Sequence, residues 1–179
     1  AACVSIDISH KQSIAGRALA DRYACEVALI QGDVALLPLS SSLYRTFDLV
    51  HTSGGICFAD EPAQAVRAAA ACLKPGGQFI LSTVHPLFAA EWLETDEDER
   101  GLFVEDYFHP PQDYGVTQDG RGDTACRTFP VSVIAEWLHE AGLVLERLLE
   151  PMATQQEPAP YTSQDWLQWK ERFLQVPGT

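Results

Sequence analysis

Two aspartates follow short apolar runs, at positions where a carboxylate can bind a ligand. Asp7 lies in the run CVSIDI, and Asp33 follows the run VALIQ after a single glycine, Gly32. A carboxylate beyond the end of a strand can accept two hydrogen bonds from neighbouring hydroxyl groups, and its charge strengthens both. Each aspartate also has a purely structural interpretation, because Asp7 can cap the next helix and aspartate after glycine is common in turns.

Histidines provide the candidates for proton transfer. His85 follows the apolar run FILSTV, and His109 lies in the segment VEDYFHPP together with Tyr107. An imidazole can take a proton from a hydroxyl or an amine as that group becomes a nucleophile. A histidine followed by proline, as both of these are, is also typical of a loop with no catalytic role.

The first half of the chain alternates apolar runs with segments of helical periodicity. Ser9–Tyr23 and Pro62–Leu73 have the spacing of helices, and the second is expected to end where KPGG follows it. The predicted strands are Cys3–Ile8, Val27–Gln31, Phe47–Thr52 and Phe79–Val84. Helices between strands predict an α/β three-layer sandwich, a mostly parallel sheet with helices on both faces. In such a sheet ligands bind at the carboxyl ends of the strands, which is where Asp7 and Asp33 fall.

The pattern lapses between about residues 85 and 129, where the sequence is rich in acidic and turn-forming residues. A connection of this length is rarely structureless, so we predict a lid or substrate-binding insertion. A helix is predicted from Phe129 to Glu140, and Leu143–Leu149 alternates like a strand. Trp166–Val176 fits either a helix or a closing strand. No linker divides the chain, which predicts a single domain over residues 1–179.

Four segments, in this order and spacing, resemble the class I S-adenosylmethionine-dependent methyltransferases, specifically those that modify small molecules. They are VSID, GDVALLP, FDLVHTSGG and LKPGGQFILSTVHP, and the resemblance extends from Val4 to about Glu150. It implies a Rossmann-like fold, S-adenosylmethionine as the cofactor and a small-molecule methyl acceptor. Each segment alone is a weak signal, whereas the ordered series is fairly specific.

The resemblance assigns a role to each segment. Asp7, with Ile8 beside it, would bind the ribose of the cofactor. Asp33 would accept the adenine amino group, with Gly32 and Val34 lining the same place. Thr52 and Ser53 would pass close to the methionine part of the cofactor, where Gly54 and Gly55 permit close approach of the backbone.

The acceptor side is assigned to the insertion and its borders. Tyr107 and His109 are the expected substrate-side residues, and Arg127 stands where relatives carry a basic residue. His85, just past the fourth predicted strand, lies at the right edge of the sheet to act as a base. A sulfonium methyl group is already an activated electrophile, so alignment of the acceptor supplies much of the acceleration.

One part of the family pattern is missing. The family begins with a strand and a glycine-rich GxGxG turn, and no GxGxG occurs in this chain. That strand lies between the first and third strands predicted here, so two strands should face a gap with unpaired backbone groups. We therefore predict an N-terminally truncated domain that binds S-adenosylmethionine weakly or not at all. A non-catalytic methyltransferase-like module is the main alternative, and an NAD(P)-dependent dehydrogenase is a weaker one.

Composition limits the partners. The formal net charge is −13, which disfavours nucleic acid, and no apolar run is long enough to span a membrane. Of the five cysteines, Cys3, Cys57 and Cys72 lie in apolar stretches and are expected to be buried free thiols. No metal-binding spacing is present, and free thiols indicate a cytoplasmic setting. The oligomeric state is left open.

Overall fold

The computed structural model describes residues 3–37, 42–89, 91–94, 100–116 and 122–150. The chain divides into two compact units, Ala1–Leu145 and Glu146–Thr179. All helices and strands given below belong to the first unit. No helix in the described part of the chain combines the length and hydrophobicity needed to cross a membrane.

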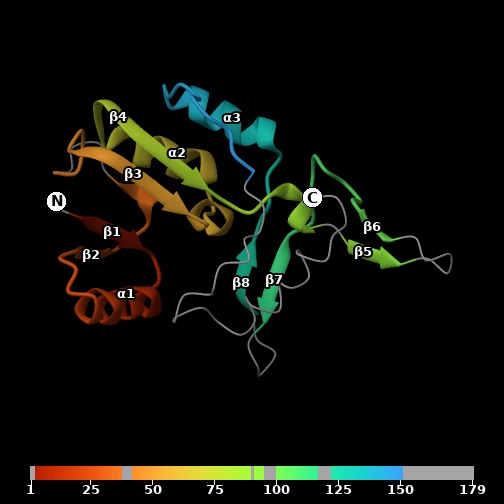
Figure 1. The fold of residues 1–179 in the computed structure, drawn as a ribbon, viewed down its shortest axis with the longest axis horizontal. Coiled ribbons are helices and arrows are strands. Elements are labelled where there is room, and N and C mark those ends of the chain that lie inside the picture. The colour runs from red at the N-terminus through yellow and green to blue at the C-terminus, as the bar shows by residue number, and fades with distance from the viewer. Residues whose placement is uncertain (1–2, 38–41, 90, 95–99, 117–121, 151–179) are drawn as a thin grey trace. The chain divides into compact units, whose positions relative to one another are not determined.

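The N-terminal part is a β–α–β unit (Figure 1). Strand β1 (Val4–Asp7) pairs in parallel with β2 (Ala28–Gln31), and helix α1 (His10–Arg22) connects them. Ser9 caps the start of α1, because its hydroxyl accepts a hydrogen bond from the Gln12 amide at 3.3 Å. The unit places the ends of β1 and β2 next to each other.

A second parallel pair follows. Strand β3 (Phe47–Ser53) pairs with β4 (Leu73–Ser82), and helix α2 (Pro62–Ala71) connects them by way of the short helix η2 (Gly55–Phe58). Small side chains let α2 pack closely, and its buried residues are Ala65, Val66 and Ala68. Proline at the first position of α2 costs no hydrogen bond, since that amide has no helical partner.

The KPGG segment differs from the prediction. It was expected to be the loop that ends the helix, but it lies inside β4 as a bulge: Phe47 pairs with Leu73 and Leu49 with Gln78, so four residues of β4 oppose Asp48 alone. A Cβ atom on Gly77 would come within 3.1 Å of the Asp48 carbonyl oxygen. Glycine is therefore required by the close approach of two backbones.

The two parallel pairs are separate sheets in the described residues (Figure 1). No backbone hydrogen-bond ladder in the described part of the chain joins β1 to β3. Helix α1 contacts β1 and β2, whereas α2 contacts β4. The face of the second sheet that bears Leu49 and Ile80 is exposed, at 50% and 48% of these residues' surfaces. The α/β fold with parallel strands is thus confirmed, although as two pairs of strands.

The region predicted as an insertion contains regular structure. After η3 (Pro86–Ala89), β5 (Glu91–Glu94) pairs antiparallel with β6 (Arg100–Phe103). A second antiparallel pair, β7 (Asp113–Val116) and β8 (Gly122–Cys126), follows. The predicted lid region is therefore built largely of two hairpins.

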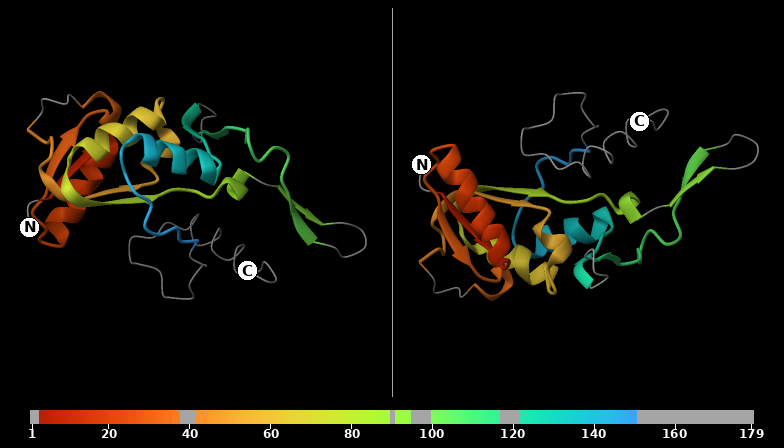
Figure 2. Two further views of the ribbon diagram at one scale, coloured as in Figure 1. Left: turned by 90° about the horizontal axis from the view of Figure 1, so that it is seen from above. Right: turned by 90° about the horizontal axis from the view of Figure 1, so that it is seen from below.

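Helix α3 (Val131–Glu140) lies beside α2 (Figure 2). Arg67 of α2 and Glu140 of α3 form an exposed ion pair at 3.5 Å, and the rings of Phe129 and Trp137 meet edge to face at 4.8 Å. Gly142 follows the end of the helix with a left-handed φ of 77°, a conformation that glycine adopts readily.

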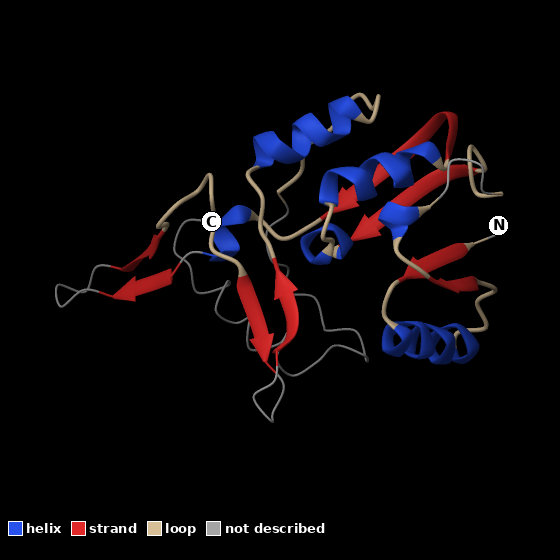
Figure 3. Ribbon diagram, turned by 180° about the vertical axis from the view of Figure 1, so that it is seen from behind, coloured by secondary structure: helices blue, strands red, loops and turns tan. Residues whose placement is uncertain are grey.

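Two sequence predictions are wrong. Residues 143–149 form no strand (Figure 3), because no neighbouring strand in the described residues supplies hydrogen-bond partners for their backbone. Cys3 is exposed rather than buried, whereas Cys57 and Cys72 are buried as expected. The segment Trp166–Val176 lies outside the described residues.

Candidate functional site

The ends of β1 and β2 bring the first predicted residues together. The Gly32 amide donates to the Asp7 carbonyl oxygen at 3.0 Å, which joins the two strand ends. The Asp7 carboxylate accepts a hydrogen bond from the Ser9 amide at 2.7 Å through Oδ1. Its second oxygen has no hydrogen-bond partner among the described residues. Asp7 therefore both orders the start of α1 and offers an exposed acceptor.

Asp33, like Asp7, orders the start of a helix and keeps acceptor capacity for a ligand. Its Oδ1 accepts from the Ala35 amide at 2.9 Å and so caps the short helix η1 (Val34–Leu36). Asp33 and Val34 are half-buried. A carboxylate has two oxygens with several acceptor sites, so capping leaves capacity for a ligand amino group.

Apolar surface borders the two carboxylates. Ile8, directly after Asp7, is 69% exposed, and Leu36 in η1 is 73% exposed. A Cβ atom added at Gly32 would meet no atom within 4 Å, so the chain is open at that point. Exposed aliphatic side chains beside two carboxylates suit a flat heterocycle attached to a sugar, because the ring covers the apolar surface while polar groups bind the oxygens.

The end of β3 carries the remaining cofactor-side residues. Thr52 is half-buried and Ser53 is exposed. Gly54 follows with a left-handed φ of 69°, and its amide donates to the Ser82 carbonyl oxygen at 2.8 Å. A side chain on Gly55 would press against the Thr52 hydroxyl at 3.3 Å. The two glycines therefore keep the backbone accessible where β3 ends.

The two halves of the predicted cofactor site are connected through η1 and α2. Gln64 of α2 donates from Nε2 to the carbonyl oxygen of Ala35 at 2.8 Å, and Ala35 is buried. Helix α2 in turn contacts β4, which pairs with β3. The Asp33 loop is thus fixed to the sheet that carries Thr52 and Ser53.

His85 is held in one orientation by the backbone. Its Nδ1 accepts a hydrogen bond from the Leu87 amide at 3.1 Å, so the neutral ring carries its proton on Nε2. In that arrangement the lone pair on Nδ1 already accepts the hydrogen bond from Leu87. His85 is placed to donate a hydrogen bond rather than to accept a proton, and its predicted role as a base gains no support from this geometry.

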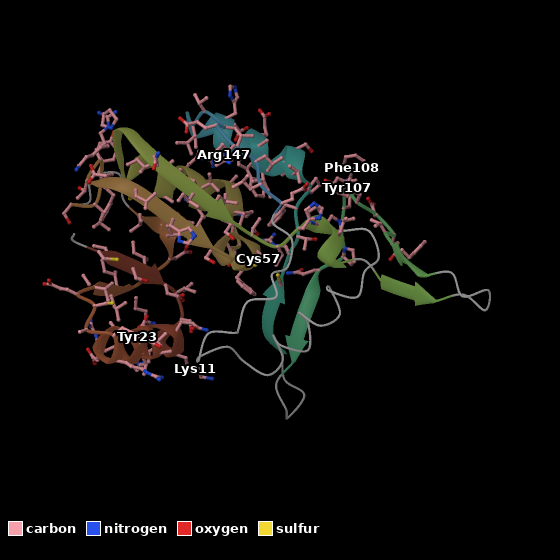
Figure 4. All side chains as sticks on the ribbon, viewed as in Figure 1. Lys11, Tyr23, Cys57, Tyr107, Phe108 and Arg147 are labelled. Carbon is pink, nitrogen blue, oxygen red and sulfur yellow. The ribbon has the colours of Figure 1, made fainter. Side chains whose placement is uncertain are left out.

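Tyr107 and Arg127 make contacts that hold the insertion in place. The Tyr107 hydroxyl accepts from the Val131 amide at 3.4 Å, and its ring meets Phe108 edge to face (Figure 4). The Arg127 guanidinium donates from Nη2 to the carbonyl oxygens of Ala59 and Asp60, the latter at 3.0 Å. Both residues therefore have structural partners, which limits what they can offer to a substrate.

A pair that sequence reasoning missed lies in the same loop. Asp106 accepts the amides of Phe108 and His109 through Oδ1, both at 2.9 Å, and its Oδ2 lies 3.1 Å from His109 Nδ1. The hydrogen bond from the His109 amide contributes most to holding the pKa of Asp106 below its usual value. The His109 side chain and the Phe108 amide lower it further. Because the carboxylate only accepts, Nδ1 donates and Nε2 keeps its lone pair. The signal in the sequence was the Asp-x-x-His spacing in a turn.

Metal chemistry has no candidate here. Among the residues that the structure describes, no group of three or more histidine, cysteine or acidic side chains could hold an ion.

The fold has clear relatives among solved structures. An S-adenosylmethionine-dependent methyltransferase from Mesorhizobium loti has a TM-score of 0.67 at 20% identity, over 96% of this chain and 73% of that one. A Listeria monocytogenes protein proposed to be such an enzyme gives 0.68 at 17% identity, over 86% of this chain and 68% of that one. A methyltransferase of this kind from Clostridium acetobutylicum gives 0.53 at 15% identity, covering 79% and 63%.

A family comparison finds a similarity for the N-terminal part of the chain, a little less than half of its length. Residues 1–81 match the family of methyltransferase domains. This part of the chain is similar to that family. A comparison with curated proteins gives no match. The methyltransferase segment includes all of the predicted cofactor-side residues, from Asp7 to Ser53, and ends within β4. The resemblance stated from the sequence is thereby confirmed for the family and the fold.

Within the matched segment, the residues present fit one part of S-adenosylmethionine better than another. The Asp7, Ile8 and Asp33 region offers carboxylates and apolar surface for a nucleoside. The methionine end has Thr52, Ser53 and the two glycines, but the glycine-rich turn is not among the described residues. The arrangement is therefore suited to hold the nucleoside part and to border the reacting part.

Proposed function

We propose that the protein is an S-adenosylmethionine-dependent methyltransferase that acts on a small-molecule acceptor. The observation that carries this proposal is the convergence of Asp7 and Asp33 at the joined ends of β1 and β2, within the segment that matches the methyltransferase family. The free Asp7 oxygen binds the ribose hydroxyls, and Asp33 accepts the adenine amino group. Ile8 packs on the ring, and the backbone of Val34 follows its edge.

When bound, S-adenosylmethionine supplies a methyl group on a positively charged sulfur. The residues of this chain orient that group and the acceptor rather than activate the methyl. Thr52 and Ser53 border the methionine part, and Gly54 allows the backbone to approach it. Holding two reactants in line removes much of the entropic barrier.

His109 is the proposed base on the acceptor side, with Asp106 as the residue that positions it. The Asp106 carboxylate fixes the ring so that Nε2 presents its lone pair, and the His109 side chain is 86% exposed. This orientation suits removal of a proton from an acceptor hydroxyl or amine. Replacement of His109 by Gln should lower methyl transfer about 10²–10⁴-fold and leave cofactor binding unchanged.

A small molecule is a better candidate for the methyl acceptor than a nucleic acid. The formal charge of −13 repels a phosphate backbone. The sequence motifs are those of the small-molecule group of methyltransferases.

The proposal includes a further strand and glycine-rich turn beside β1 and β3. In the described residues β1 pairs only with β2 and β3 only with β4, so each has one edge without a ladder partner, and backbone groups inside a sheet are normally paired. Without that element the chain should bind S-adenosylmethionine weakly. Micromolar affinity of the 179-residue chain, measured by calorimetry, would contradict this part.

Activity is tested with S-adenosylmethionine labelled in its methyl group and a panel of small-molecule hydroxyls, amines, thiols and carbon acids. Transfer to at least one acceptor, lost in Asp33→Asn and kept in the surface control Glu140→Gln, is the expected result. The proposal fails if no labelled product forms from a version of the protein that binds the cofactor tightly. A non-catalytic methyltransferase-like module then remains.

A further inference from the structure

Two cysteines far apart in the sequence lie close together in the structure. Cys57 is in η2, and Cys126 is the last residue of β8. The Arg127 amide nitrogen donates to the Cys57 carbonyl oxygen at 2.8 Å. Because that nitrogen is bonded to the carbonyl carbon of Cys126, the two cysteine α-carbons lie within about 7.5 Å. Disulfides join α-carbons that are usually about 4.4–6.8 Å apart, so the backbone is near the required separation.

The side chains also meet. The elements that carry the two cysteines, η2 and β8, are in contact, and burial first and the neighbouring Cys126 thiol second raise the pKa of Cys57 to about 12. Cys57 is 1% exposed, and its sulfur donates to the Gly54 carbonyl oxygen at 2.7 Å, which fixes the side chain near the end of β8 (Figure 4). Cys126 is only half-buried. The Cys126 thiol can therefore be reached from solvent, whereas the neighbouring Cys57 thiol is buried.

We propose that Cys57 and Cys126 are a redox-active pair that forms an intramolecular disulfide when the protein meets hydrogen peroxide. Cys126 reacts first, because it is the more exposed of the two. Its sulfur takes one oxygen atom from the peroxide, which gives a sulfenic acid and one water molecule. The Cys57 sulfur then attacks the Cys126 sulfur, the S–O bond breaks, and the thiol proton leaves with the hydroxyl as a second water. Two thiols lose two electrons and one peroxide gains them.

The position of the pair gives the bridge a consequence. Cys57 lies three residues after Gly54, where β3 ends, and Cys126 closes the second hairpin of the insertion. A bond between them joins the segment after β3 to the insertion. Because burial keeps Cys57 protonated at neutral pH, the second step is slower than the reaction of an exposed thiol. The bridge therefore forms under sustained oxidation and is removed by a dithiol reductant.

The test is peptide mapping of the full chain after treatment with hydrogen peroxide. Remaining thiols are blocked with N-ethylmaleimide, and the protein is digested without reduction and examined by mass spectrometry. The expected result is one cross-linked peptide pair that contains Cys57 and Cys126 and separates on reduction with dithiothreitol. The oxidised protein should also unfold at a higher temperature, because a cross-link constrains the unfolded chain.

Variants separate this pair from the other thiols. Cys126→Ser should abolish the cross-link and leave Cys57 as a free thiol, whereas Cys72→Ala removes another buried thiol and should leave the cross-link intact. Cys126→Ser alters a half-buried residue, so it keeps the test informative if Cys57→Ser does not fold. The proposal is overturned if Cys57 stays reduced while Cys3 and Cys25 are oxidised. It is equally overturned if Cys126 proceeds to a sulfinic acid without forming the bridge.

Discussion

The carboxylates differ in how much of their hydrogen-bonding capacity the fold uses. Asp106 accepts at both oxygens, from two amides and from His109. Asp7 and Asp33 each accept one amide, from Ser9 and Ala35. A carboxylate that caps a turn through one oxygen is held rigidly, and the other oxygen stays available. The structural and binding interpretations of Asp7 and Asp33 are therefore compatible, because a protein carboxylate binds a ligand better when its orientation is fixed before the ligand arrives.

Asp48 and Lys74 lie in two of the segments that resemble the methyltransferase family, and they interact with each other. Their side chains form an ion pair at 2.7 Å, and this contact lowers the pKa of Asp48 below its ordinary value of 3.8. A carboxylate with a lowered pKa stabilises the folded state fully above pH 3.8, and this contribution is lost as the pH falls through the lowered value. The Asp48→Asn variant should thus lose less thermal stability than the wild type between pH 5 and pH 2 (about those limits).

The effect should be small, since Asp48 is exposed and surface ion pairs contribute little. Thermal unfolding followed by circular dichroism at a series of pH values measures it, and Lys74→Met should flatten the same profile. An unchanged pH profile in both variants would show that the pair does not persist in solution.

Single residues show the limit of sequence reasoning. Asp7, Asp33 and Ser53 could be selected as candidate ligand-binding residues because each follows an apolar run, and the family resemblance then implied their roles toward the cofactor. The role of Arg127 was not predictable, since its partners are backbone carbonyls of residues 59 and 60, far from it in the sequence. The orientation of His85 was equally hidden, because it depends on one backbone amide.

The bulge in β4 is the element whose geometry depends most on glycine. A Cβ atom on Gly77 would lie 3.0 Å from the Lys74 carbonyl oxygen and 3.1 Å from that of Asp48. We expect Gly77→Ala to destabilise the protein by about 1–3 kcal/mol, since the backbone has to shift. The matched control is Gly101→Ala, because a Cβ atom there meets nothing within 4 Å. Chemical denaturation measures both; equal stability of the two variants would contradict the close approach.

Arg127 fastens the insertion to the segment after η2. Its guanidinium binds the carbonyl oxygens of Ala59 and Asp60 and lies 5.7 Å from the centre of the Phe129 ring. Arg127→Met should therefore cost about 1–3 kcal/mol, because it leaves carbonyl groups without their partner. Arg127→Lys should recover only part of this, since lysine lacks the planar fork. A variant of unchanged stability but weakened acceptor binding would instead support the substrate role inferred from the sequence.

Elements were predictable where the hydrophobic period is unbroken. β1, β2, β3, α1 and α3 follow their predicted ranges within about two residues. The hairpins of the insertion were not predicted, because segments such as GDTAC and DYGV contain glycine and polar residues without a strand period. The bulge in β4 was missed because proline and glycine there signal a stop, whereas the pairing resumes at Gln78.

At the scale of the whole molecule, the two parallel pairs are two parts of one predicted sheet. Each carries one half of the proposed cofactor site at its carboxyl edge, and the contact between Gln64 and Ala35 connects them. The central claim is that the first half, around Asp7 and Asp33, recognises the nucleoside. This claim does not depend on the methionine half and can be tested on the chain itself.

The most direct measurement is an NMR titration of the ¹⁵N-labelled 179-residue chain with S-adenosylhomocysteine, carried to millimolar concentration because weak binding is expected. The predicted result is a set of saturable amide shifts at Asp7, Ile8 and residues 32–34, greatly reduced in Asp7→Asn and Asp33→Asn and not reproduced by NADH. Contradiction would come from the absence of any shift, from shifts confined to other parts of the chain, or from a stronger response to NADH at the same amides.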